Sequence, residues 1–201
     1  MIRGGLTGGF ASGKSFVSNI LQKLGCHVVR ADELGHQVLE LGGEAYSEVV
    51  KLFGLQILDP GGAIDRRRLA AEVFDSPGRL AQLNAIVHPS VIRREEQFLQ
   101  RAEAADPDGI GIVEAAILIE TGSYKRFDKL ILVACTPEQQ LERAMKRGAY
   151  TRTEVLARLS RQMPVEEKRR FADYVINTSG TEEETVEQTQ EVYRSLRSIE
   201  R

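Results

Sequence analysis

The chain has 201 residues, of which 42% are hydrophobic and 28% charged, a composition that supports one compact domain and is untypical of disordered chains. Basic residues number 27 and acidic residues 29, and the formal net charge of −2 argues against a general surface for nucleic acids. The basic residues divide into 20 Arg and 7 Lys. Compositional bias and local arginine clusters that bind phosphate are both open explanations for this excess.

The first residues of the chain predict a strand, a helix and a second strand. Residues 2–6 form an apolar but glycine-weakened strand, and apolar side chains recur at helical spacing over 14–24. Gly25 occupies the position of a C-terminal helix cap. Residues 26–30 then read as a second strand that ends at Ala31-Asp32.

The middle of the chain is richer in helical patterns, and residues 33–107 are expected to form a helical insertion. Strand character returns over 110–119, where the apolar run Ala115–Ile119 resembles a strand buried on both faces. Within the insertion, breaks are expected at Asp59-Pro60-Gly61-Gly62, Ser76-Pro77-Gly78 and His88-Pro89.

The last third of the chain begins with another apolar strand over 130–134. Thr136-Pro137-Glu138 has the features of a helix start, and residues 151–172 form a charged helical segment. A short strand over 174–176 precedes a C-terminal helix, which a Thr181–Glu184 capping box opens and which reaches about Ser198. This alternation predicts an α/β fold with a central parallel sheet between helices.

The two cysteines and the N-terminal segment bear on the compartment. Cys26 and Cys135 lie far apart without metal-ligand spacing, so we expect two reduced, buried thiols, with one disulfide as the alternative. The glycine-rich start MIRGGLTGGF does not resemble a signal peptide, and no run approaches the roughly 18 apolar residues of a membrane span. We expect a cytoplasmic protein without a membrane segment.

The sharpest motif is Gly8-Gly9-Phe10-Ala11-Ser12-Gly13-Lys14-Ser15, which satisfies the P-loop pattern between a predicted strand and a predicted helix. Its glycines let backbone N–H groups converge on an anion, and the helix dipole adds positive potential. Lys14 is expected to reach the β/γ-phosphates and the Ser15 hydroxyl to ligate Mg²⁺. The motif predicts binding of a nucleoside triphosphate.

Asp32 is a candidate for the chemistry because it follows the second strand, and ligands bind at the carboxyl ends of parallel strands. A carboxylate there deprotonates an acceptor hydroxyl or holds a metal-bound water. Asp is also a preferred helix N-cap, so both functions remain open at this point.

Beyond these motifs, the chain resembles the dephospho-coenzyme A kinase family in the order and spacing of many segments. The matching segments are LTGGFASGKS, Ala31-Asp32 with His36, Gly62–Arg66 with Leu69 and Phe74, Ile86–Pro89, Ile117–Glu120, Arg143–Arg147, Arg158–Gln162, Lys168, Ala172-Asp173, and Val175–Asn177 with Gly180. The chain departs from the family pattern at Arg30, where an Asp is usual, at Ala116, where Pro is common, and at Phe16, where Thr is common.

The resemblance implies transfer of the γ-phosphoryl group of ATP to the 3′-hydroxyl of dephospho-coenzyme A, the last step of coenzyme A synthesis. Asp32 is then the catalytic base, and Arg143 stabilises the charge of the transferring group with help from Arg147. Without the resemblance, surface ion pairs of these arginines with Glu138 and Glu142 are the simpler explanation. The implied nucleotide site consists of Gly9, Ala11, Ser12, Gly13, Lys14, Ser15 and Phe16, with Ser15 as the Mg²⁺ ligand, and the implied acceptor side consists of Asp32, Arg66, His88, Glu120 and Arg147. His88 before Pro89 has a structural turn as its alternative.

The resemblance also implies the organisation of a P-loop NTPase-type three-layer sandwich. A single kinase domain would have its core at about 1–32, 108–136 and 173–201, with an acceptor-binding insertion at about 33–107 and a lid at about 137–172 that shields ATP from water. The expected partners are the two substrates, with no nucleic acid or membrane, and the expected state is a monomer or small homo-oligomer. The alternative function is another small-molecule P-loop kinase, such as a nucleoside monophosphate or shikimate-type kinase. A GTPase switch is disfavoured because the chain has no Asn-Lys-x-Asp motif.

Overall fold

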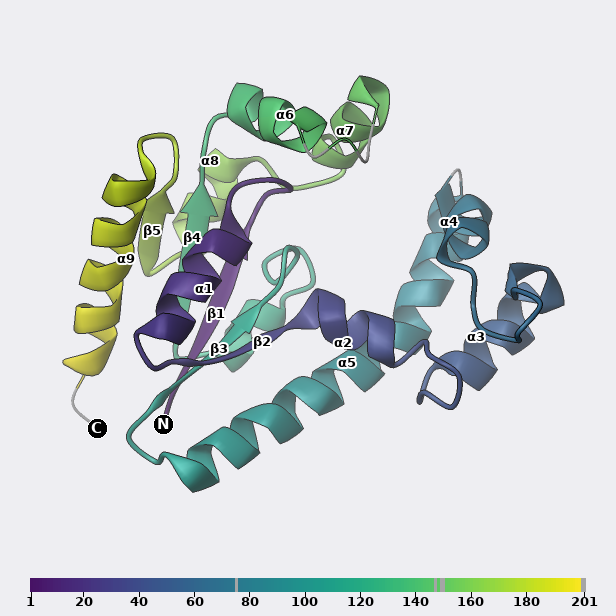
Figure 1. Ribbon diagram of the computed structural model, residues 1–201, viewed down its shortest axis with the longest axis horizontal. Helices are drawn as coiled ribbons and strands as arrows, with labels where there is room; N and C mark the ends of the chain where they lie inside the picture. The colour runs from purple at the N-terminus through teal and green to yellow at the C-terminus, as the bar shows by residue number, and fades with distance from the viewer. Residues whose placement is uncertain (75, 147, 149–150, 200–201) are drawn as a thin grey trace. The chain divides into compact units, whose positions relative to one another are not determined.

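The computed structural model describes residues 1–74, 76–146, 148 and 151–199 (Figure 1). They belong to two compact units, Met1–Val29 with Leu99–Arg201 and Arg30–Phe98. The second unit starts earlier and ends earlier than the expected insertion at about 33–107. Ala31 and Leu34 pack with its core, whereas Leu99 lies against Gly111 in the first unit. In the part of the chain that is described, no helix is long and apolar enough to cross a membrane.

The first unit is built on a five-stranded sheet with strand order β2-β3-β1-β4-β5. The pairs β1–β3, β1–β4 and β4–β5 are parallel, which agrees with the predicted parallel sheet. Its strands are β1 (Ile2–Gly8), β2 (His27–Arg30), β3 (Ile110–Glu114), β4 (Lys129–Ala134) and β5 (Tyr174–Asn177). The chain leaves the carboxyl end of the central strand β1 directly into the P-loop, so this motif lies at the edge of the sheet where ligands bind.

The two glycines of β1 do not weaken the centre of the sheet, because neighbouring side chains fill the space above them. A Cβ atom on Gly4 would lie 2.6 Å from Cδ1 of Ile112, and one on Gly5 would lie 2.8 Å from Cδ2 of Phe127. Leu118 also approaches Gly5, at 3.0 Å from the same hypothetical atom. The glycines therefore allow large apolar side chains from other elements to close over the strand.

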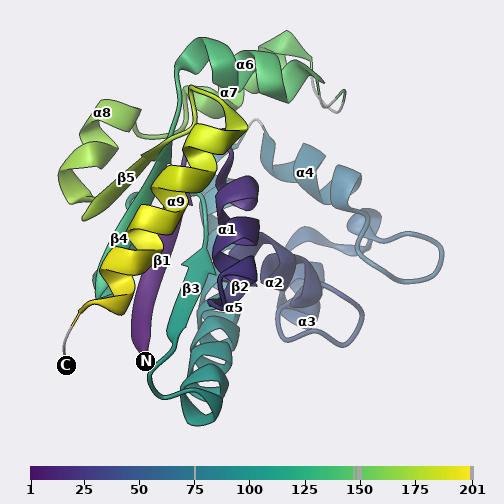
Figure 2. The ribbon, with the colours of Figure 1, turned by 60° about the vertical axis from the view of Figure 1, so that its left-hand side comes forward.

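One face of the sheet is covered by α1 (Lys14–Lys23) and α9 (Glu182–Arg197), which lie side by side (Figure 2). Helix α1 ends in a Schellman motif: Gly25 has φ 100°, its N–H donates to the Gln22 carbonyl, and the Cys26 N–H donates to the Leu21 carbonyl. Helix α9 begins with the predicted Thr181–Glu184 capping box. Both predicted helix boundaries are confirmed.

The opposite face is covered by the end of α5 (Pro77–Ala105) and by the segment after β3. The predicted extension of β3 to Ile119 is wrong, because the strand ends at Glu114 and residues 116–122 form turns. The Thr121 and Gly122 N–H groups donate to the carbonyls of Ile117 and Ile119. The apolar run is a turn in which Ala115, Leu118 and Ile119 are buried, and hydrophobicity alone does not distinguish it from a buried strand.

Short helices lie between β4 and β5 in the chain and near the carboxyl end of the sheet (Figure 1). Helix α6 begins as predicted, with a reciprocal cap in which the Gln139 N–H donates to Thr136 Oγ1 and the Thr136 N–H donates to Gln139 Oε1. The elements of this region and of the turn before β4 are η2 (Ser123–Arg126), α6 (Pro137–Lys146), α7 (Arg152–Leu159), α8 (Val165–Lys168) and η3 (Arg169–Phe171).

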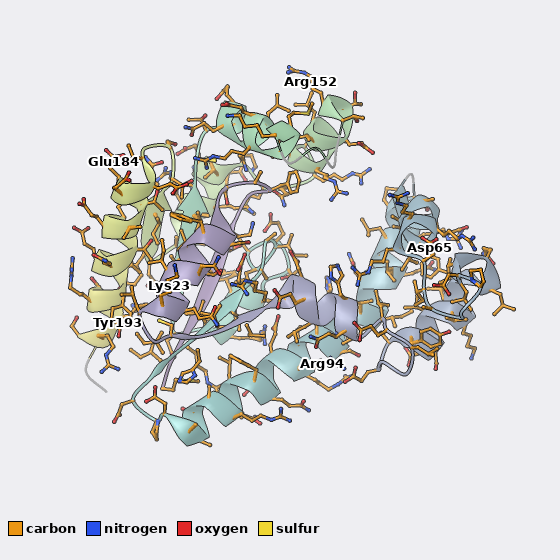
Figure 3. The ribbon with its side chains drawn as sticks, in the orientation of Figure 1. Lys23, Asp65, Arg94, Arg152, Glu184 and Tyr193 are labelled. Carbon is orange, nitrogen blue, oxygen red and sulfur yellow. The ribbon has the colours of Figure 1, made fainter. Side chains whose placement is uncertain are left out.

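The second unit is helical and has its own hydrophobic core, formed by Val38, Val49, Phe53, Ile57, Leu69 and Val91. Its elements are α2 (Ala31–Gln37), α3 (Tyr46–Phe53), η1 (Leu55–Ile57), α4 (Arg66–Phe74) and the first part of α5. Arg94 on α5 binds both carboxylate oxygens of Glu44, at 2.9 and 2.7 Å, and donates to Gln37 (Figure 3).

The predicted break at His88-Pro89 is wrong, because α5 passes through Pro89 without ending. A proline in a helix removes one backbone donor and usually causes a kink, but the packing of neighbouring residues such as Val91 against this unit's core holds the helix together. The alternative of His88 as a turn residue is therefore excluded as well.

Candidate active site

The P-loop adopts the backbone conformations that its glycines predict. Gly13 has φ 95° and forms the N-cap of α1, while the Ser12 N–H closes a turn onto the Gly9 carbonyl at 3.2 Å. Ala11 has φ 58°, which is strained for a residue with a side chain. Gly8 has no room for a Cβ atom, which would lie 2.3 Å from the Val133 carbonyl oxygen. Such a loop at a helix N-terminus is suited to an anion.

The side chains of the loop are also arranged for a ligand. Lys14 folds back over the loop, and its Nζ donates to the carbonyls of Gly8 at 3.1 Å and Gly9 at 3.0 Å. Ser12 is 1% exposed, and within the described residues its Oγ has no hydrogen-bond partner. A buried hydroxyl without a partner and an ammonium group held over the loop fit the binding of a phosphate chain.

Ser15, the predicted Mg²⁺ ligand, meets a carboxylate that sequence reasoning missed. Its Oγ donates to Oε1 of Glu114 at 3.1 Å, and Ser18 Oγ donates to Oε2 of the same residue at 2.7 Å. Glu114 is the last residue of β3 and is 7% exposed. A hydroxyl and a carboxylate are the hard oxygen ligands that Mg²⁺ prefers, so these residues fit that ion.

The outer side of the P-loop is held by side chains from the segment predicted as a lid. Gln140 on α6 donates to the Phe10 carbonyl at 2.7 Å, and Gln162 after α7 accepts from the Phe10 N–H at 2.8 Å. The Arg158 guanidinium lies 5.6 Å from the centre of the Phe10 ring. These contacts tie α6, the end of α7 and the segment directly after α7 to the P-loop.

Arg143 is half-buried on α6 and binds Thr178, not the glutamates weighed as its surface partners. Its guanidinium donates to Thr178 Oγ1 at 3.1 Å and to the carbonyl oxygen of the same residue. Glu142 instead pairs with Lys146 at 2.7 Å. Arg147 lies outside the described residues.

Glu120 lies in the turn after β3, is itself partly exposed, and pairs with a buried lysine. Lys168 on α8 is 1% exposed, and its Nζ lies 2.8 Å from Glu120 Oε1 and 3.3 Å from the Ala116 carbonyl. The Met163 N–H also donates to Glu120 Oε1, at 3.2 Å. This oxygen therefore fixes the position of the α8 segment.

The remaining predicted residues belong to the second unit. Asp32 is exposed in the first turn of α2, whose N-cap is Arg30, so the alternative that Asp32 caps the helix is wrong. Arg66 is exposed at the start of α4, where the Asp65 carboxylate accepts from the Arg67 and Arg68 N–H groups (Figure 3). These bonds hold the pKa of Asp65 below its usual range.

His88 lies half-buried on α5, in the same unit. Its burial lowers the pKa of the imidazole, because desolvation disfavours the charged form. The neutral ring is therefore the form present near pH 7.

The structure thus brings Lys14, Ser15 and the loop backbone together in one cradle, and it adds Glu114 to them. Three contributors were missed: Glu114, Thr178 and the buried Lys168 as an ion-pair partner. Glu114 had a detectable signal, since it is an acid at a strand end, but extending the strand to Ile119 concealed it. Thr178 had no such signal, and Lys168 had none apart from the family resemblance.

Comparison with protein families agrees with the phosphate-binding geometry of the P-loop. The family model described as dephospho-CoA kinase matches residues 2–184. The chain belongs to the dephospho-CoA kinase family. Among curated relatives, the dephospho-CoA kinase of Aquifex aeolicus (strain VF5) is 42% identical over 98% of both chains. That of Bacillus cereus (strain ATCC 10987 / NRS 248) is 39% identical over 98% of both chains.

Solved structures agree on the fold. The crystal structure of TT1252 from Thermus thermophilus has a TM-score of 0.84 at 36% identity and covers 96% of both chains. The dephospho-CoA kinase from Campylobacter jejuni, with a TM-score of 0.64 and 23% identity over 96% of each chain, shares the fold. The predicted family, the kinase class and the P-loop fold are confirmed, and the dephospho-CoA kinase assignment is favoured over another P-loop kinase.

Proposed function

We propose that this member of the family transfers the γ-phosphoryl group of ATP to the 3′-hydroxyl of dephospho-coenzyme A with Asp32 as the base. The 3′-oxygen forms a bond to the γ-phosphorus, the bond from that phosphorus to the bridging oxygen breaks, and ADP leaves. The hydroxyl proton passes to the Asp32 carboxylate. The observation that carries this proposal is the P-loop cradle in a chain that the dephospho-CoA kinase model matches over residues 2–184.

The nucleotide side of the proposal uses Gly9, Ala11, Ser12, Gly13, Lys14, Ser15 and Phe16. The backbone from Gly9 to Phe16 turns into the N-terminus of α1, and no acidic residue stands in the first turn of that helix. The positive end of the helix dipole therefore faces the phosphates without a neutralising charge from its own first turn. Lys14 exchanges its two loop carbonyls for phosphate oxygens when ATP binds.

Mg²⁺ is proposed to bind at Ser15 with Glu114 beside it. The Ser15 hydroxyl would hold the ion, and the Glu114 carboxylate, which accepts hydrogen bonds from Ser15 and Ser18, would add negative charge beside it. When bound, Mg²⁺ would supply positive charge that offsets the charge of the phosphates. Ser15→Ala is expected to raise the Mg²⁺ concentration needed for half-maximal rate.

The acceptor side is proposed to consist of Asp32, Arg66, His88, Glu120 and Arg147, as the family motifs imply. Asp32 and Arg66 are exposed, as a base and a phosphate ligand must be before substrate binds. The neutral His88 suits a hydrogen bond with the acceptor and not an ion pair. Residues 33–107 hold the acceptor and residues 137–172 act as the lid in this proposal.

Arg143 is proposed to stabilise the charge of the transferring phosphoryl group. Its guanidinium is held next to the P-loop by Thr178, whose hydroxyl also contacts the Ser12 carbonyl. A fixed guanidinium stabilises developing charge better than a mobile one, because it reorganises less during the reaction. Arg143→Ala is expected to lower turnover far more than ATP affinity.

The test compares Asp32→Asn with the neighbouring Glu33→Gln, both exposed acids of the first turn of α2. We expect Asp32→Asn to bind ATP as the parent does and to lose at least about 100-fold in turnover with dephospho-coenzyme A, since a general base contributes about 10²–10⁴-fold. Glu33→Gln should change neither. Near-parent turnover of Asp32→Asn would remove Asp32 from the chemistry, and faster turnover with AMP, CMP or shikimate would overturn the acceptor assignment.

A further inference from the structure

Thr178 stands outside the P-loop and directly after β5, yet its side chain connects the two parts of the nucleotide site. It is 4% exposed, and its Oγ1 donates to the Ser12 carbonyl oxygen at 2.7 Å. The same oxygen accepts from Arg143 at 3.1 Å. One hydroxyl therefore contacts both the loop that binds phosphate and the arginine assigned to the transferring group.

The hydrogen bond from Thr178 to the Ser12 carbonyl sets the direction in which the Gly13 N–H of the P-loop points. The Ser12 carbonyl and the Gly13 N–H belong to one peptide unit, and in a trans peptide these two groups point in opposite directions. Holding the carbonyl toward Thr178 turns the Gly13 N–H to the other side of the peptide. Because Gly13 has φ 95°, where the chain is not confined by helical geometry, this peptide needs an external contact to fix its orientation.

Thr178 is itself held in place by the sheet and by packing. Its N–H donates to the Ala134 carbonyl at 2.8 Å, which extends the pairing of β4 with β5 by one residue. A Cβ atom on Gly13 would lie 3.4 Å from Thr178 Cγ2, which is ordinary contact distance, so the methyl group faces the bare Cα of Gly13. A threonine fixed in this way provides a rigid reference for the loop.

The second arm of Thr178 orients Arg143. The two terminal nitrogens of the guanidinium donate hydrogen bonds to Oγ1 and to the carbonyl oxygen of Thr178. Two hydrogen bonds to one residue restrict rotation of the planar guanidinium group. Gln139 reinforces the contact by donating to the Ser179 carbonyl at 2.8 Å. Helix α6 is thereby tied to the loop after β5 at two adjacent carbonyls.

We propose that Thr178 is a positioning residue for phosphoryl transfer, whose hydroxyl fixes the Ser12–Gly13 peptide for nucleotide binding and aligns Arg143. The part that concerns Arg143 rests on the proposed function. The part that concerns the peptide requires only that the P-loop binds a nucleotide.

The first test measures ADP affinity in the presence of Mg²⁺ by calorimetry. Thr178→Val removes the hydroxyl at nearly constant shape and is expected to weaken ADP binding about tenfold, as loss of one buried hydrogen bond implies. Thr178→Ser keeps the hydroxyl and should bind within about threefold of the parent. The matched control is Thr189→Val, which removes a buried hydroxyl that donates to the Thr185 carbonyl within α9 and should leave affinity unchanged.

Two outcomes overturn the peptide arm: ADP affinity of Thr178→Val equal to that of Thr189→Val, or Thr178→Ser as weak as Thr178→Val. If the valine variant does not fold, Thr178→Ala takes its place, because it also removes the hydroxyl and is expected to weaken ADP binding about tenfold relative to Thr178→Ser. This measurement involves no acceptor, so it stands even if dephospho-coenzyme A is not the substrate.

The second test is a double-mutant cycle on kcat with saturating ATP. Thr178→Val is expected to lower kcat about tenfold in the parent and less than threefold when Arg143 is already Ala, because the hydroxyl then has no guanidinium to align. Equal losses in both backgrounds would overturn the shared positioning role. If the parent shows no kinase activity, the proposed function fails while the ADP result still decides the peptide arm.

Discussion

Replacing Lys168 by Met should expose how strongly the protein depends on an ion pair whose lysine is almost entirely buried. The lysine is 1% exposed, and its Nζ lies 2.8 Å from Glu120, whose side chain is 21% exposed. Methionine fits the volume left by the aliphatic part of the lysine. It leaves the Glu120 carboxylate and the Ala116 carbonyl without the charged donor that they share.

The expected cost follows from burial. Removing one partner of a buried pair costs about 3–5 kcal/mol, because the other charge is left uncompensated. Glu120 retains some contact with solvent and keeps the Met163 N–H as a donor, which lowers the expected loss to about 2–3 kcal/mol. For a chain of this size, that loss corresponds to a fall in Tm of about 4–12 °C.

The assay is thermal unfolding followed by circular dichroism, with Lys146→Met as the control. Lys146 Nζ also pairs with Glu142, at 2.7 Å, but the lysine side chain is 74% exposed, so its replacement should not change the Tm measurably. The double variant Lys168→Met with Glu120→Gln should lose less than the sum of the two single losses, since neither charge is then stranded. A Lys168→Met protein that melts within 1 °C of the parent would refute the argument (about a quarter of the smallest expected shift).

Three further predictions follow from burial and backbone space. Gly8→Ala should abolish ATP binding in a titration, because the alanine Cβ would lie 2.3 Å from the backbone oxygen of Val133. That oxygen belongs to β4 and cannot move unless the sheet moves. ATP affinity equal to that of the parent would contradict this prediction. Cys26 and Cys135 are unpaired and buried, and burial raises the pKa of Cys26 to about 12, so both should react with a thiol reagent at pH 8 only after denaturant is added. Burial lowers the pKa of His88, so the unfolded chain binds a proton at a higher pH than the folded chain does. The free energy of unfolding should therefore fall on acidification through the ordinary histidine range. His88→Gln should flatten this dependence in urea titrations at pH 7 and pH 5.

Local signals in the sequence were sufficient where the physical cause is local. The P-loop, the Schellman end of α1 at Gly25 and the Thr181–Glu184 capping box each depend on hydrogen bonds within a few residues. These features could be predicted because the residues that form them are adjacent in the chain. The alternation of apolar runs and helical patterns also predicted the parallel sheet.

The errors occurred where the environment decides the conformation. The run Ala115–Ile119 has the composition of a buried strand, but β3 already ends at Glu114 and the run closes as a turn over Gly5. Pro89 reads as a break, yet α5 continues through it because its flanks pack into a core. In both cases the deciding contacts come from residues far away in the sequence.

The sequence by itself determined the phosphate cradle, the fold class and the family, because the glycines, Lys14 and Ser15 of one short motif are recognisable without their surroundings. Tertiary structure alone decided what surrounds that cradle. Glu114 reaches Ser15 because β3 and β1 are neighbours in the sheet, and Thr178 reaches Ser12 because β5 ends beside the P-loop. Lys168 becomes a buried ion-pair partner only when α8 packs against the turn after β3. Contacts between residues about 50 or more positions apart have no local pattern, so only the folded chain reveals them.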